Sequence, residues 1–194
     1  MEESPEPPVA LFTEPEAVRK LSTLTTPTGP VAVFPYLDLP VEELLERSAR
    51  LVLLHGVQDP GNVGTVIRAA HAFGAGVVLS RGCADLYNPK TVRSTMGSIF
   101  HAPVTREVDT PAFLWECRER GFRPFGAVPV GGGPPGSLAA GKTVVVVGAE
   151  GAGLPEEVLR ACEATVTVPS RAASLNAAVA ASILLYEAYT RVLP

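Results

Sequence analysis

Residues 51–80, LVLLHGVQDPGNVGTVIRAAHAFGAGVVLS, decide the fold class of this 194-residue chain. Residues 51–57 form an apolar run without alternation, residues 64–73 have helical spacing, and residues 77–80 are apolar again. A strand without alternation is typical of a parallel sheet that is covered on both faces, and a helix between two such strands supplies the crossover. We therefore predict an α/β fold with a mostly parallel sheet flanked by helices.

The same pattern continues to the C-terminus. Further strands are expected at 102–105, 122–128, 143–148 and 165–169, and further helices near 89–97 and at 110–120, 155–162 and 174–192. Before residue 51 we predict a helix that starts at Pro15 and ends at Leu21, a strand at 31–36 and a short helix or linker at 40–50.

The composition excludes several classes of protein. A hydrophobic content of 46% can bury one domain core, and a net charge of −4 argues against a nucleic-acid binder that works through bulk charge alone. The cysteines Cys83, Cys117 and Cys162 are odd in number and far apart, so they predict neither a disulfide framework nor a metal site. Neither a membrane span nor a secretory signal is evident, and we expect a cytoplasmic protein.

Three polar segments follow predicted strands, which is where ligands bind in open α/β sheets. In the first, residues 58–68 (QDPGNVGTVIR), Asn62 can cap the next helix, Gly64 allows close approach of another backbone, and Arg68 lies one turn further on. The alternative is a capped helix with one solvated arginine. The G-x-x-G spacing, without an acid at the end of the next strand, disfavours a nicotinamide-binding oxidoreductase.

The second segment is residues 148–155, GAEGAGLP. Its glycines Gly148, Gly151 and Gly153 allow the loop to turn its amides toward a ligand, and Glu150 is placed at the edge of the sheet. The alternative is a cluster of loop glycines with an exposed glutamate.

The third segment is residues 169–182, PSRAASLNAAVAAS, where Ser174 and Asn176 stand at the start of an apolar helix. A helix cap is the alternative for Asn176. The chain has only three Asn and one Gln, and Gln58, Asn62 and Asn176 all fall in the three post-strand segments. A sequence that otherwise avoids amides keeps them where a ligand is expected.

Residues 51–74, 144–155 and 166–187 resemble, in order and spacing, the three signature motifs of the SpoU/TrmH-type RNA 2′-O-ribose methyltransferases of the SPOUT superfamily. The resemblance implies a C-terminal trefoil knot, a homodimer and S-adenosyl-L-methionine bound at the knot. It implies methylation of a ribose 2′-hydroxyl in RNA, with ribosomal RNA expected ahead of transfer RNA. A knotted RNA-binding module without activity is the alternative from another class.

The resemblance also assigns site residues. The catalytic positions that match the motifs are Asn62, Arg68, Glu150, Ser174 and Asn176. The expected cofactor contacts are Ala127, Val128, Gly148, Gly151, Val168, Pro169 and Leu175. The expected RNA contacts are Arg68, Lys90, Arg93 and Arg171. Arg68 is expected to reach the site of the other protomer, and Ser170-Arg171 and Ala177-Ala178 depart from the usual pattern of the family.

Residues 9–36 resemble the last part of the L30e-like RNA-binding domain that precedes the catalytic domain in many members of this family. We therefore expect residues 1–50 to be a remnant of that domain plus a linker, and residues 51–194 to be the methyltransferase domain.

Overall fold

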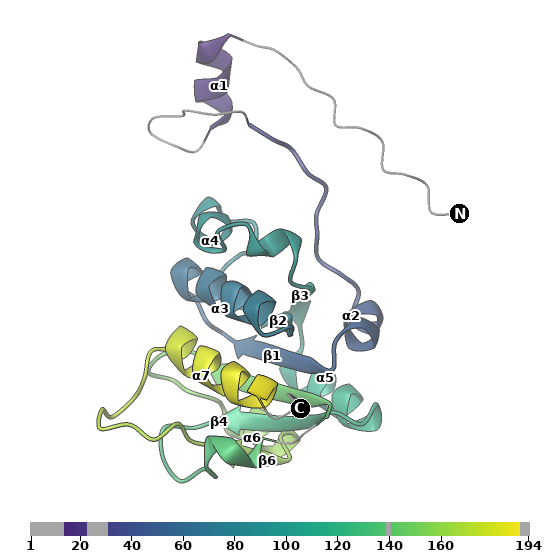
Figure 1. Cartoon of the computed structure of the whole chain (residues 1–194), viewed down its shortest axis with the longest axis vertical. Helices are drawn as coiled ribbons and strands as arrows, with labels where there is room; N and C mark the ends of the chain where they lie inside the picture. Colours follow the sequence, from purple (N-terminus) through teal and green to yellow (C-terminus); the bar gives the residue numbers. More distant parts are fainter. Residues whose placement is uncertain (1–13, 23–30, 139–140, 191–194) are drawn as a thin grey trace. The chain divides into compact units, whose positions relative to one another are not determined.

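The computed structural model describes residues 14–22, 31–138 and 141–190, which belong to two units, 1–36 and 37–194 (Figure 1). In the first unit, helix α1 (Pro15–Leu21) begins at the proline, as predicted. Residues 31–36 form no regular structure, so the strand predicted there is wrong. Pro35 has no N–H to donate, and none of the described strands pairs with this segment.

The second unit is built on a parallel sheet of six strands in the order β3-β2-β1-β5-β4-β6. The strands are β1 (Arg50–His55), β2 (Gly76–Ser80), β3 (Val104–Val108), β4 (Arg123–Ala127), β5 (Thr143–Gly148) and β6 (Ala164–Val166). The central strands β1 and β5 pair in register from Arg50 and Thr143 to His55 and Gly148. The predicted parallel α/β sheet is therefore confirmed.

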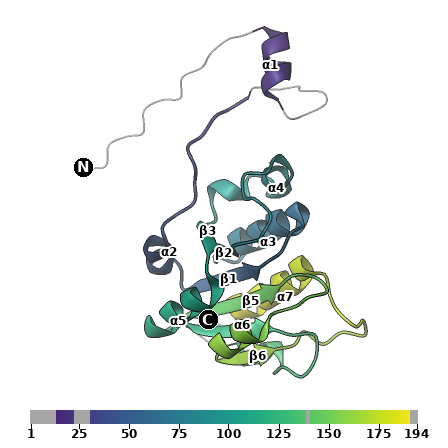
Figure 2. The ribbon, with the colours of Figure 1, turned by 180° about the vertical axis from the view of Figure 1, so that it is seen from behind.

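Helices cover both faces of this sheet (Figures 1 and 2). They are α2 (Val41–Arg47), α3 (Pro60–Ala72), α4 (Pro89–Ser94), α5 (Thr110–Glu119), α6 (Glu156–Ala161) and α7 (Ala177–Thr190), with single 3₁₀ turns η1 (Ser98–Phe100) and η2 (Pro135–Ser137). Alternate residues of β1 enter different cores. Val52 and Leu54 pack in the cluster under α3 and α7, whereas Leu51 and Leu53 pack in the cluster under α2, α5 and α6. Burial on both faces explains why the strands show no alternation.

Helix α2 belongs to the second unit, which begins at Leu37 and not at residue 51 as expected. Leu44 and Leu45 of α2 are buried in the cluster under α5 and α6. The segment before α2 is also attached to the sheet edge, since the Leu39 N–H donates to the Val104 carbonyl at 2.8 Å. The linker was misplaced because an amphipathic helix does not show in sequence which core it packs against.

Two helices start more than two residues from the predicted position. Helix α3 starts at Pro60, ahead of residue 64, because the Asp59 side chain accepts the N–H of Asn62 at 2.8 Å and caps it. The prediction that Asn62 is the cap is therefore wrong. Helix α7 starts at Ala177 and not at Ser174, because the Asn176 side chain accepts the N–H groups of the two residues that follow Ala177, at 3.0 and 3.1 Å.

The segment 128–133, which follows β4, lies against the end of β6 and the residue after it. Val128 N–H donates to the Val166 carbonyl at 2.9 Å, and the Thr167 N–H donates to the Gly133 carbonyl at 2.8 Å. The trefoil knot remains a prediction. Within the described ranges, no helix has both the length and the apolar character needed to cross a membrane.

Candidate functional site

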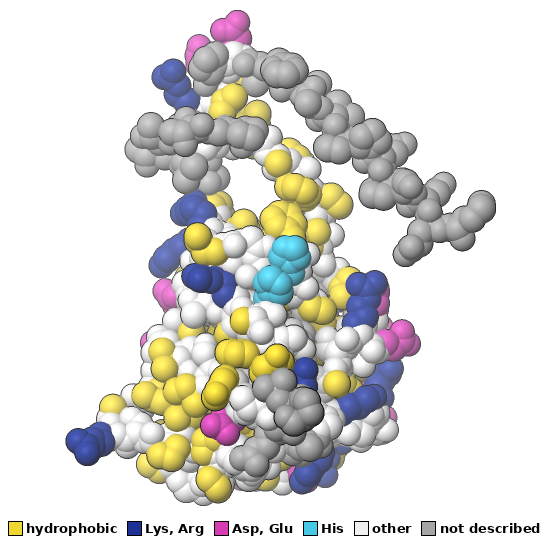
Figure 3. Space-filling model, in the orientation of Figure 1, with side chains coloured by type: hydrophobic (Ala, Val, Ile, Leu, Met, Phe, Trp, Pro, Cys, Tyr) yellow, Lys and Arg dark blue, Asp and Glu magenta, His cyan; other side chains and the backbone are white. Residues whose placement is uncertain are grey.

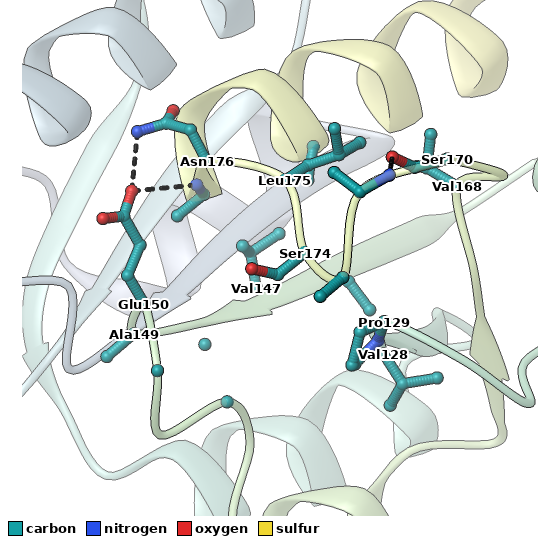
Figure 4. Close-up of a pocket in the computed structure, with 18 of the residues that line it drawn as sticks. Val128, Pro129, Val147, Ala149, Glu150, Val168, Ser170, Ser174, Leu175 and Asn176 are labelled. Atoms are coloured by element: carbon teal, nitrogen blue, oxygen red, sulfur yellow. Dashed lines mark hydrogen bonds between the residues drawn. The ribbon is translucent and has the colours of Figure 1, made fainter.

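The second and third polar segments meet the end of β4 at the carboxyl ends of β5, β4 and β6 and enclose a cavity of about 440 Å³ (Figure 4), whereas the first segment does not line it. This volume is within the range of sites for small organic ligands. The cavity is lined by Ala127, Val128, Pro129, Val147, Gly148, Ala149, Glu150, Gly151, Gly153, Val166, Val168, Ser170, Ala172, Ala173, Ser174, Leu175, Asn176, Ala177 and Ala180. Small side chains predominate, so much of the polar surface offered to a ligand is backbone.

A tight loop after β5 forms one side of this cavity. Residues Ala149 and Gly153 form an antiparallel bridge, with the Gly153 N–H donating to the Ala149 carbonyl at 2.9 Å. Gly151 and Gly153 have φ angles of +84° and +67°, which glycine adopts without steric cost. A Cβ atom on Gly148 would lie 2.2 Å from the Gly153 carbonyl oxygen. The loop can fold back on the strand only because residue 148 has no side chain.

The opposite side of the cavity comes from the two segments that follow β4 and β6. The Thr167 hydroxyl joins them: it accepts the Gly132 N–H at 2.9 Å and donates to the Val128 carbonyl at 3.0 Å. Gly132 permits this contact, since a Cβ there would lie 2.7 Å from the Val166 carbonyl carbon. Val128 and Pro129 lie at the end of the cavity away from Glu150 (Figure 4).

A carboxylate and two amides form a hydrogen-bonded cluster at the rim. Glu150 Oε1 accepts from Asn62 Nδ2 at 3.0 Å, from Asn176 Nδ2 at 2.6 Å and from the Ala177 N–H at 3.3 Å. Asn176 Nδ2 also approaches Asn62 Oδ1 at 3.0 Å. Glu150 and Asn176 face each other at one end of the cavity in Figure 4. Asn176 therefore caps α7, which was the alternative interpretation of this residue, and it also takes part in the rim cluster.

The predicted site residues divide into two groups. Six of the seven expected cofactor contacts line the cavity, as do Glu150 and Ser174; the exception is Pro169, which is exposed between two lining residues. A cofactor contact by Pro169, expected through its backbone, remains a prediction. The sequence interpretation missed lining residues that have no polar side chain, such as Pro129, Ala173 and Ala180. Their nearness to the motifs was the only signal.

The expected RNA-binding cations are not in the cavity. Arg68 is exposed on α3, six residues or about 9 Å beyond Asn62 along the helix axis and about a third of a turn around it. Lys90 pairs with Asp59 at 3.5 Å, and Arg93 and Arg171 are exposed. Glu150 is the single ionisable side chain among the described residues that line the cavity. The cavity therefore suits a ligand that carries positive charge and hydrogen-bonds to backbone.

Comparison with known proteins agrees with this geometry. The sequence pattern of the SpoU rRNA Methylase family matches residues 49–186. A *Bacillus subtilis* relative, 23S rRNA (guanosine(2553)-2′-O)-methyltransferase RlmP, is 41% identical over 149 residues, which cover 75% of this chain and 60% of that protein. A *Streptomyces viridochromogenes* relative, 23S rRNA (uridine(2479)-2′-O)-methyltransferase, is 36% identical over 176 residues, which cover 82% of this chain and 60% of that protein.

A solved structure gives the same result. The AdoMet-bound rRNA methyltransferase from *Sinorhizobium meliloti* superposes with a TM-score of 0.74 at 35% identity, over 81% of this chain and 62% of that one. The chain spans about 60% of the length of the two curated relatives. The match of the family pattern includes all six strands, the residues that line the cavity and Asn62. This chain belongs to the SpoU rRNA Methylase family.

Proposed function

We propose that this chain transfers the methyl group of S-adenosyl-L-methionine to a ribose 2′-hydroxyl of RNA, with ribosomal RNA as the substrate. The observation that carries the proposal is the rim cluster of Asn62, Glu150 and Asn176 beside a cavity of about 440 Å³. The two curated relatives are named for 2′-O-methylation of 23S rRNA, which favours ribosomal RNA over the alternative, transfer RNA.

The cavity fits the cofactor in shape and charge. Small apolar side chains leave room for a flat ring, and the backbone at Ala127, Val128, Val168 and Leu175 would hydrogen-bond to it. When bound, the cofactor supplies an electrophilic methyl group on a positively charged sulfur. The Glu150 carboxylate is the charged side chain at the cavity wall and favours a cationic ligand there.

The residues of the chain would then position the hydroxyl and stabilise the charge that develops on its oxygen. Asn62 and Asn176 are held by Glu150 and can fix the sugar at the rim. Arg68 cannot accept the hydroxyl proton, because a guanidinium has donors only and no free lone pair. We assign it to a phosphate of the target nucleotide and to the developing alkoxide, with the proton passing to a phosphate oxygen or to water.

This role of Arg68 requires a homodimer, because Arg68 does not line the cavity of its own chain. In the dimer, Arg68 of one protomer would serve the cavity of the other. Lys90, Arg93 and Arg171 would hold phosphates without reading sequence. We also propose that residues 1–36 add RNA contacts, as an L30e-like remnant would, and that the protein works in the cytoplasm.

The test measures methyl transfer and cofactor binding separately. We expect Arg68→Ala to lower the methylation rate at least 100-fold, to leave the calorimetric affinity for S-adenosylmethionine within twofold, and to be rescued only in part by Arg68→Lys. Arg47→Ala is the control, since Arg47 lies on α2 and pairs with Glu43. Normal turnover by Arg68→Ala would remove Arg68 from the reaction. A wild-type protein that binds RNA but not S-adenosylmethionine would be the inactive module instead.

Mass mapping of ribose methylation identifies the substrate. RNA from a strain that lacks the gene should lose one 2′-O-methyl group in ribosomal RNA, and the purified enzyme should restore it. If transfer RNA lost the group and ribosomal RNA were unchanged, the substrate would be transfer RNA and not ribosomal RNA.

A further inference from the structure

Met96 has an unusual backbone conformation and an exposed side chain. It follows α4 with a φ angle of +49°, in the left-handed region, and the residue is 75% exposed. The next residue, Gly97, has a φ angle of +86°, which is free of steric cost for glycine. A bulky apolar residue at such a position is strained and gains nothing from burial. The fold therefore keeps a methionine where glycine would be more stable.

The turn that carries Met96 runs alongside Arg68. Residues Gly64, Arg68 and His71 have the i, i+4, i+7 spacing that places them on one stripe of α3. At one end of the stripe, a Cβ on Gly64 would lie 2.4 Å from the Cβ of Ser94. At the other end, His71 Nδ1 lies 3.2 Å from the Ser98 hydroxyl. Arg68 lies between these contacts, beside the segment 94–98.

The surface around Met96 is basic although the chain is acidic overall. Residues 60–72 and 89–101 contain Arg68, Lys90, Arg93, His71 and His101 and no Asp or Glu, in a chain of net charge −4; Asp59, just before the first range, pairs with Lys90 at 3.5 Å. Figure 3 shows Lys and Arg side chains in dark blue over α3 and α4 and two adjacent His side chains in cyan on the same face. Such a surface attracts a polyanion.

Flat and apolar groups lie among these charges. The rings of His71 and His101 are stacked, with centroids 4.7 Å apart and planes 15° from parallel. Phe100, next to His101 in the chain, is half exposed. Apolar side chains and flat rings between cations match the chemistry of an unpaired nucleotide, whose base has an apolar face and whose phosphate is anionic.

We propose that Met96 contacts the nucleobase of the RNA segment presented for methylation, while Arg68 and the α4 cations hold its phosphates. The inference rests on the proposed function and adds a specificity-determining residue to it. The strained conformation aims an apolar side chain outward from the basic surface, in reach of a base that leaves its stack. A dimer contact made by Met96 itself is the rival explanation for its outward side chain.

The experiment uses the full chain and an unmodified transcript of 23S rRNA. Met96→Gly relieves the left-handed strain, so we expect its melting temperature to rise by about 2–4 °C. We expect kcat/KM for RNA to fall about tenfold, with the affinity for S-adenosylmethionine within twofold of wild type. Met96→Asn, which tolerates the same backbone, should lose as much activity, and Met96→Leu should retain it. Trp115→Ala is the matched control, since Trp115 is 51% exposed beside Arg118 on α5.

Salt dependence separates base contact from phosphate contact. The slope of log affinity for RNA against log salt concentration should be unchanged in Met96→Gly and should fall by about one in Arg93→Gln. Wild-type kcat/KM in Met96→Gly and Met96→Asn would overturn the inference, as would an equal loss in Trp115→Ala, a lower melting temperature in Met96→Gly or a change of oligomeric state in light scattering. Absence of methyl transfer by the wild type would instead contradict the proposed function.

Discussion

Replacing Gly148 by Ala is expected to open the side of the cavity formed by residues 149–153. Gly148 is not in the left-handed region, so alanine has no backbone penalty there and the effect is steric. The new Cβ would lie 2.2 Å from the Gly153 carbonyl oxygen and 2.8 Å from the Leu154 nitrogen, whereas ordinary contact begins near 3.4 Å. The loop must retreat by about 1 Å, because both neighbours are backbone atoms.

The cost can be worked out from the contacts that this shift breaks. Forced repacking costs about 1–3 kcal/mol, and loss of the Gly153–Ala149 hydrogen bond adds about 1 kcal/mol. The reduced entropy of the unfolded chain returns about 0.5 kcal/mol. We therefore expect the free energy of unfolding to fall by about 1.5–3.5 kcal/mol and the melting temperature by about 3–14 °C. Glu150 and Gly151 move with the loop, so the affinity for S-adenosylmethionine should fall at least tenfold, or about 1.4 kcal/mol.

Thermal unfolding and calorimetry with S-adenosylmethionine measure both effects. The control is Gly82→Ala, where φ is +83° and no atom lies within 4 Å of the added Cβ. That variant should lose about 1 kcal/mol from the left-handed conformation alone and should bind the cofactor as wild type does. If Gly148→Ala kept both its melting temperature and its cofactor affinity, the reasoning would be refuted, since the close contact would then not shape the cavity.

Three further predictions concern single side chains. Glu150→Gln should lower the free energy of unfolding by about 0.5 kcal/mol, because the charge at the start of α7 is lost. Glu150→Ala should lower it by about 1–2 kcal/mol, because three donors lose their acceptor. Equal losses for the two variants in urea titrations would contradict this. Burial lowers the pKa of His55 from its usual 6.5, against an opposing effect of Glu157, so the unfolded chain binds the proton first and stability falls as the pH drops below about 6.5. His55→Asn should flatten that profile in melts between pH 5 and 7, and an unchanged slope would exclude His55 as the cause. Burial raises the pKa of Cys117 to about 12 and that of Cys162 to about 11, so iodoacetamide at pH 8 should label neither thiol until urea is added, as mass spectrometry would show.

The sequence predicts a structural feature correctly where that feature depends only on the residues of one short segment. The apolar runs at 51–57 and 143–148 predict buried parallel strands, because only such strands are covered on both faces. The segment 31–36 is apolar as well, yet it forms no strand, since a strand also needs a neighbour to pair with. The cap of α3 was predicted at the wrong residue for a related reason. Asp59 and Asn62 are both residue types that cap helices, and the path of the backbone selects Asp59.

The sequence by itself determined the parallel α/β class and the three segments that supply a ligand site, because apolar runs and post-strand polar residues are written locally. Only the tertiary structure decided that one carboxylate oxygen of Glu150 serves two amides, 88 and 26 residues away along the chain. The tertiary structure also placed Arg68 outside the cavity, and it placed Met96 in a strained turn beside Arg68. Distances between remote residues depend on how helices pack on the sheet, and that packing is a property of the whole core, not of any one segment.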